Sequence, residues 1–154
     1  SGFNLSNVER SIYLDPHFDT WLGRAADFLR AGSRPQLAHF LAHNRKGALK
    51  AFDAAVQALA GNPAAGSDAA VIDARLNGAV DELAKVAALG GAEDDFRTRS
   101  LSDRARSLQD ELASAVDRLR HVGADATDAD KLDAFEGLLV SLVRAYGLAK
   151  EAES

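Results

Sequence analysis

Two histidines four residues apart, His39 and His43, come closest in this chain to the spacing of a metal site. Side chains at i and i+4 share one face of a helix, so two imidazoles there could hold a zinc ion, with His17 as a third ligand. The glutamate that follows the first histidine in zinc proteases is missing, and no third ligand stands at a fixed spacing. We therefore expect an ordinary surface pair, with no bound metal and no cofactor.

The carboxylates form no better catalytic site. They occur as sequence neighbours, and neighbours on a helix point about 100° apart instead of converging. The adjacent pairs are Asp81-Glu82, Asp94-Asp95 and Asp110-Glu111. The sequence has no nucleophile elbow, phosphate-binding glycine loop or calcium loop, and the absence of cysteine excludes a thiol nucleophile and a thiolate metal site. We expect no enzymatic activity.

The elements that position these residues are helices. The chain has 154 residues, is rich in alanine and leucine and contains only three prolines, which favours one all-α domain over residues 1–154. No run of 18 apolar residues is present. A net charge of −5 argues against nucleic-acid binding. The Ser-Gly start and the lack of methionine lead us to expect a fragment of a larger protein.

The apolar periodicity predicts an antiparallel four-helix bundle with a short N-terminal helix and a short connector helix. Capping patterns at Ser33, Ser67, Ser100 and Thr127 mark helix starts. We expect the helices at about 6–13, 16–32, 34–60, 68–89, 101–121 and 128–151, with a connector at about 92–99. A heptad seam runs from Leu101 to Val122.

Most aromatic residues fall on these apolar stripes, so we expect them in the core. They are Phe18, Trp21, Phe28, Phe40, Phe52, Phe135 and Tyr146. Phe96 lies off every long stripe, within the connector. Two interpretations stay open for it: a cap over the end of the core, or an exposed apolar anchor.

Positive charge is concentrated in one stretch. No acid occurs between Asp27 and Asp53, where five cations stand: Arg30, Arg34, Arg45, Lys46 and Lys50. In an up-down bundle, the loop at 31–33 and the connector at 92–99 share one end, which brings Arg30 and Arg34 to Arg97 and Arg99. Such an end suits an anionic membrane, where each cation is worth about 1 kcal/mol. The alternative is that these arginines pair with local carboxylates such as those at 93–95.

The stretch from Ile12 to Leu22, the alanine-rich helices and the basic end resemble the four-helix-bundle membrane localization domains of bacterial toxins and effectors, including lipid-raft-targeting domains of Bordetella type III secretion effectors. The resemblance implies docking on anionic phospholipids, phosphoinositides included, of the host plasma membrane's inner leaflet after secretion into the host cell. It places lipid binding on Arg30, Arg34, Leu37, Phe96, Arg97 and Arg99. The acidic run at 93–95 departs from a purely cationic end.

A second function fits the same helices: a protein-interaction module that binds a secretion chaperone or another helical partner. That function requires a long apolar groove left open along 101–122 or 132–146, whereas membrane docking requires the basic end. We expect a monomer in either case.

Overall fold

The computed structural model describes residues 17–90, 95–123 and 125–154, and these residues form helices and turns without any strand. The all-α prediction is confirmed for them. The helices are α2 (Phe18–Arg30), α3 (Arg34–His43), α4 (Arg45–Ala60), α5 (Asp68–Leu89), α6 (Phe96–His121) and α7 (Asp128–Ala152). The expected helix at 6–13 lies outside the described residues.

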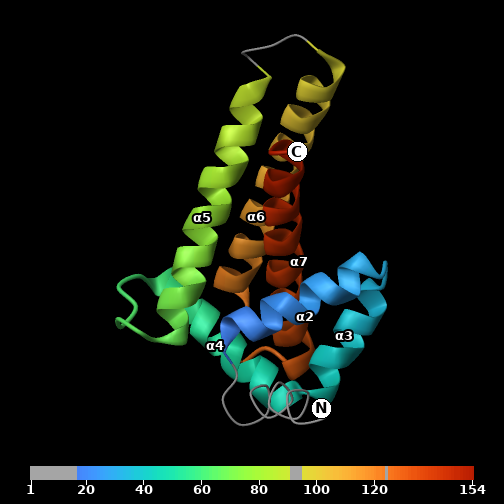
Figure 1. Cartoon of the computed structure of the whole chain (residues 1–154). Helices are drawn as coiled ribbons and strands as arrows, with labels where there is room; N and C mark the ends of the chain where they lie inside the picture. Colours follow the sequence, from blue (N-terminus) through green and yellow to red (C-terminus); the bar gives the residue numbers. More distant parts are fainter. Residues whose placement is uncertain (1–16, 91–94, 124) are drawn as a thin grey trace, which may run out of the picture.

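Three long helices form a column. Helices α5, α6 and α7 have 22, 26 and 25 residues and pack against one another along their length (Figure 1). The side chains of Ser67 and Thr127 each accept a hydrogen bond from a first-turn backbone N–H, as their capping patterns predict. The heptad seam supplies buried Leu101, Leu112 and Leu119. The column is thus the part whose sequence pattern and structure agree best.

Helix α6 starts earlier than expected. Asp95, and not Ser100, is its N-cap: one carboxylate oxygen of Asp95 accepts from the Thr98 backbone N–H at 2.8 Å, and the other accepts from the Thr98 hydroxyl at 2.8 Å. The prediction of a cap at Ser100 is wrong because Asp95, five residues earlier, offers a charged and therefore stronger acceptor. Residues 96–99 of the expected connector therefore belong to α6, and residues 91–94 lie outside the described residues.

The shorter helices α2, α3 and α4 pack against one part of this column. Helix α2 crosses α7, while α4 packs against α5, α6 and α7 (Figure 1). The single helix predicted over 34–60 is wrong, because the chain breaks between α3 and α4 at Asn44, which has φ −109° and ψ 38°. The Asn44 side-chain amide donates to the Phe40 carbonyl at 2.9 Å, and the side chain is buried. Asparagine competes for backbone carbonyls in this way and so weakens helices.

An aromatic cluster joins the two halves. The Trp21 ring centroid lies 5.9 Å from that of Phe40 and 6.2 Å from that of Phe135, and the Phe18 centroid lies 6.3 Å from that of Phe135. Phe18, Trp21 and Phe135 are fully buried. The expectation that the aromatic stripe packs in the core is confirmed for these residues, and their contacts fix α2 and α3 on α7.

Candidate functional site

The turn between α2 and α3 carries the first three predicted site residues. Gly32 has φ +76°, and the Ser33 N–H donates to the Phe28 carbonyl at 2.9 Å while the Gly32 N–H donates to that of Leu29 at 3.0 Å. This pairing is a Schellman motif, and it ends α2 sharply. The Ser33 hydroxyl then accepts from the Gln36 N–H at 3.3 Å and starts α3, as predicted. The turn is therefore a fixed corner.

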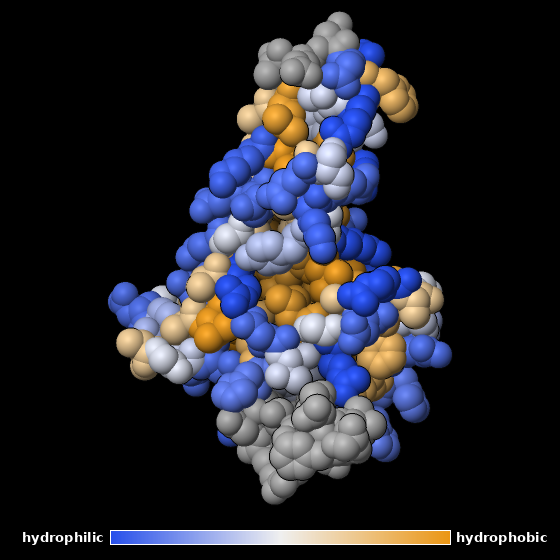
Figure 2. Space-filling model, in the orientation of Figure 1, coloured by the Kyte–Doolittle hydropathy of each residue, from blue (hydrophilic) through white to orange (hydrophobic). Residues whose placement is uncertain are grey.

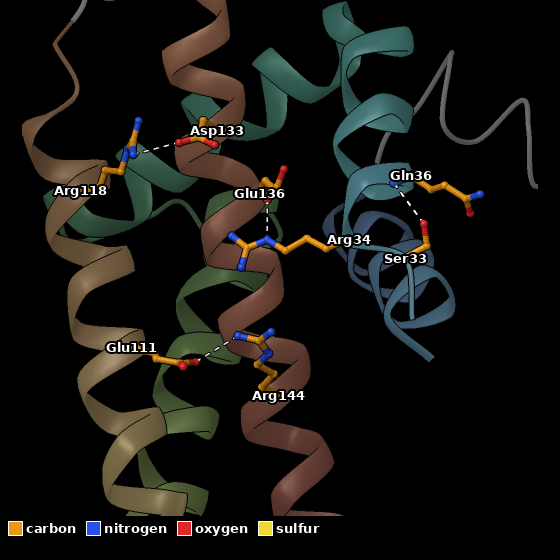
Figure 3. Close-up of polar contacts among 8 residues, drawn as sticks. All are labelled: Ser33, Arg34, Gln36, Glu111, Arg118, Asp133, Glu136 and Arg144. Atoms are coloured by element: carbon orange, nitrogen blue, oxygen red, sulfur yellow. Dashed lines mark hydrogen bonds and ion pairs between the residues drawn. The ribbon is translucent and has the colours of Figure 1, made fainter. Parts of the chain in front are cut away.

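Arg34 makes a structural contact. Its Nε donates to a carboxylate oxygen of Glu136 at 2.8 Å, which ties α3 to α7 (Figure 3). The Glu136 side chain is only 9% exposed, so its charge depends on this partner. Reversing the Arg34 charge would therefore disturb the fold as well as any surface contact.

Leu37 and Arg30 differ sharply in exposure. Leu37 is 0% exposed and belongs to the core, so the expectation that it protrudes toward a membrane is wrong: α3 turns this face onto α7. The Arg30 side chain is 76% exposed and lies 3.4 Å from a carboxylate oxygen of Asp27 one turn earlier. An exposed pair of this kind binds weakly, so Arg30 remains able to contact other anions.

The other three predicted site residues begin α6. Phe96 is 82% exposed, which settles its open interpretation in favour of an exposed side chain. Arg97 donates to the backbone carbonyls of Glu151 and Ser154 at 3.1 and 3.0 Å, next to the end of α7. Arg99 is exposed and follows within the same turn. We call Leu89, Phe96, Arg97 and Arg99 the α5–α6 end; Leu89, the last residue of α5, is also exposed.

The structure does not bring the predicted site residues of α3 together with those at the start of α6. Arg34 contacts α7 at Glu136, and Arg97 contacts it at Glu151, 15 residues further on. At 1.5 Å per residue, these contacts are about 22 Å apart along the helix axis. The prediction of one shared end is wrong because α2 and α3 are short and cross the column part-way along it, whereas α5 and α6 continue beyond them (Figure 1).

The acid-free stretch gives an exposed basic strip on α3 and α4. His39, His43, Lys46 and Lys50 are all exposed, and the two imidazole centroids lie 6.3 Å apart with nearly parallel rings. No group of three or more potential metal ligands occurs among the described residues. The acid-free stretch predicts this concentration of charge, although on one continuous helix instead of on α3 and α4.

A surface feature that the sequence did not predict is an apolar hollow between α2, α5 and α7. Its volume is about 810 Å³, and Figure 2 shows it as a recessed apolar area in the middle of the displayed face. Helix α2 contributes Leu22, Gly23, Ala26 and Leu29, and α7 contributes Val143, Tyr146 and Gly147. The only signal of this hollow in the sequence is a pair of glycines, Gly23 and Gly147, which lack side chains to fill the space between the helices.

Charged groups surround this apolar hollow. Arg75 donates through two nitrogens to the Asp19 carboxylate at 2.9 and 2.8 Å, which lowers the pKa of Asp19 and raises that of Arg75. The Tyr146 hydroxyl donates to the Arg75 carbonyl at 2.6 Å, and burial raises the pKa of Tyr146 above its ordinary value. Arg30 and Lys150 complete the rim.

Among the described residues, the stretches 101–122 and 132–146 do not show the long open groove that the alternative function, a partner-binding module, requires. Leu101, Leu112 and Leu119 are buried in the core, as are Phe135, Leu139 and Leu142. Within the described residues, no helix is both long and apolar enough to span a membrane. No protein-family model, curated protein or solved structure shows significant similarity to this chain.

Proposed function

We propose that this domain docks a bacterial effector or toxin on anionic phospholipids, phosphoinositides included, at the inner leaflet of the host plasma membrane. The observation that carries the proposal is the 82% exposure of Phe96 at the α5–α6 end. Single exposed hydrophobic residues are common on soluble proteins. Here, however, Leu89 and Phe96 end one helix and begin the next, so two apolar side chains occur at the same extremity.

Docking at the α5–α6 end combines insertion with charge. Arg97 and Arg99 lie within one turn of Phe96 and suit phosphate oxygens, while Asp95 caps the helix, and Glu93 and Asp94 precede it in the sequence. The cations and acids near Phe96 nearly balance. Binding therefore needs both the apolar side chain entering the headgroup region and the salt-sensitive contacts of the arginines with anionic headgroups.

Three of the predicted lipid-binding residues, Arg30, Arg34 and Leu37, leave the proposed contact. Leu37 is buried, and Arg34 is held by Glu136. Arg30 is an exposed cation at the α2–α3 corner, beside Asp27. The proposed lipid contact is thus Phe96, Leu89, Arg97 and Arg99, and no catalytic step belongs to it.

We further propose that α4, α5, α6 and α7 constitute a four-helix bundle to which α2 and α3 are added. The contacts of α4 with each of the three column helices support this arrangement. It resembles the membrane localization domains named from the sequence, with the exposed α5–α6 end as its docking extremity.

Vesicle co-sedimentation tests the membrane proposal. Vesicles of neutral phosphatidylcholine alone, with added phosphatidylserine, and with added phosphoinositide would be compared at low and physiological salt. We expect binding that needs an anionic lipid and weakens moderately with salt. Failure to sediment with every composition would overturn the proposal.

A further inference from the structure

The apolar hollow is a place where the fold leaves core-type side chains open to a ligand. Leu22 and Leu29 on α2 face Val143 and Tyr146 on α7 across it, and all four pack against the core while lining the hollow. Gly23 and Gly147 also line it, and for neither glycine would an added Cβ meet another atom within 4 Å. A volume of about 810 Å³ lies in the range of small-ligand sites, roughly 300–1,000 Å³.

The charge around the apolar hollow selects an anion. Its lining residues include three cations, Arg30, Arg75 and Lys150, and one carboxylate, Asp19, which gives a local charge of +2 in a chain of −5. Arg75 is fully engaged with Asp19. Among the described residues, no carboxylate lies within ion-pair distance of the Lys150 ammonium. Arg30 holds only an exposed contact with Asp27.

The shape of the apolar hollow excludes a long helix. Helix α2 crosses α7 at its edge, so an occupant that followed α7 would collide with α2 (Figure 1). The lining on α7 extends only from Val143 to Lys150, which corresponds to about 10 Å of helix axis. An occupant must therefore be short, apolar along its body and anionic at one end.

We propose that the apolar hollow binds a single-chain anionic amphiphile. Its hydrocarbon chain lies against Leu22, Leu29 and Tyr146, and its carboxylate or phosphate head contacts Lys150 and Arg30. The head could come from a fatty acid or from the phosphate of a single-chain phospholipid. The proposal is independent of membrane docking, because Leu89, Phe96, Arg97 and Arg99 do not line the apolar hollow and the ligand binds as a monomer in water.

Isothermal titration calorimetry of the full chain tests this proposal without vesicles. The probes are dodecanoate and dodecyl phosphate below their micellar concentrations, with dodecyltrimethylammonium and inorganic phosphate for comparison. We expect saturable one-to-one binding of an anionic probe, at least tenfold weaker binding of the cationic probe, and no binding of inorganic phosphate. A preference for dodecyl phosphate over dodecanoate would indicate a lipid phosphate as the source of the head.

Two variants locate the binding, each with a matched control. Gly23→Leu fills the apolar hollow, and Gly137→Leu makes the same change at a helical glycine that also has open space but does not line it. Both replace glycine inside a helix, so neither is expected to lose helicity. Lys150→Glu reverses the rim charge, whereas Lys131→Glu makes the same reversal in the first turn of α7.

The outcomes are distinct. We expect Gly23→Leu to weaken dodecanoate or dodecyl phosphate binding at least tenfold, and Lys150→Glu to weaken it several-fold, with both controls unchanged. Equal binding of anionic and cationic probes, unchanged binding in Gly23→Leu, or no binding at all would overturn the proposal. A chain that binds vesicles but no monomeric amphiphile would retain the proposed membrane function and lose this site.

Discussion

The column of α5, α6 and α7 and the crossing layer of α2, α3 and α4 are built from similar residues but by different rules. In the column, long uninterrupted seams of leucine and alanine pack helix against helix. In the crossing layer, a glycine corner at Gly32 and the break at Asn44 divide the chain into short helices, and aromatic rings hold α2 and α3 in place. The candidate binding surfaces arise where one region ends or meets the other.

The largest predicted effect concerns the column. Leu112→Asp places a carboxylate in the core, where its partner side chains are apolar, so we expect the domain to unfold. The measurement is circular dichroism with thermal melting. The control is Ser114→Asp at an exposed position two residues further along α6. A cooperative melt of Leu112→Asp near that of the wild type would show that the column does not carry the fold.

The second prediction concerns how the crossing layer is attached to the column. Arg34→Glu removes the partner of the nearly buried Glu136 carboxylate and sets a second negative charge beside it. We expect a loss of about 1–3 kcal/mol in the free energy of unfolding, because a buried charged group is left unpaired. Arg30→Glu, in the exposed neighbouring pair, is expected to change it by less than about 0.5 kcal/mol. Equal urea midpoints for the two variants would contradict the structural role of Arg34.

These two arginines show what the sequence could and could not predict. Composition and periodicity predicted the all-α class, the bounds of α5 and α7, and the caps at Ser33, Ser67 and Thr127. The acid-free stretch was visible, but nothing local told Arg34 from Arg30, because Glu136 is 102 residues from Arg34. The break at Asn44 depends on one side-chain hydrogen bond, and the apolar hollow depends on the angle at which α2 crosses α7. No periodic pattern of residues in the sequence predicts either feature.

The third prediction tests the contact between α5 and α7 beside the apolar hollow. A Cβ at Gly78 would lie 2.5 Å from the Tyr146 hydroxyl oxygen but 3.5 Å from the ring carbon that bears it. We expect Gly78→Ala to destabilise the wild type by about 1–2 kcal/mol, since the hydroxyl must move and lose its bond to the Arg75 carbonyl. In a Tyr146→Phe background the same substitution should be neutral or stabilising, because alanine favours helix.

A double-mutant cycle measured by urea unfolding checks this coupling. The result that contradicts it is additivity, with Gly78→Ala costing the same stability whether residue 146 is tyrosine or phenylalanine.

The smallest predicted effect is the pH dependence of the Asp19–Arg75 ion pair. Arg75 holds the pKa of Asp19 below its ordinary value of 3.8, so the pair stabilises the fold above that pH and loses its contribution as the pH falls through the lowered value. Both side chains are about half exposed, which limits the contribution to less than about 1 kcal/mol. Thermal melts of the wild type and Asp19→Asn should differ near neutral pH and converge in acid. A constant difference would contradict the assignment.

Membrane docking through Phe96 is the central claim, and one comparison tests it most directly. Phe96→Glu and Val80→Glu each place a carboxylate at an exposed apolar position, the first at the α5–α6 end and the second, 53% exposed, within α5. Co-sedimentation with vesicles containing phosphatidylserine and phosphoinositide would be measured for both and for the wild type. We predict that Phe96→Glu loses binding at least tenfold while Val80→Glu binds like the wild type. Undiminished binding of Phe96→Glu would contradict docking through the α5–α6 end.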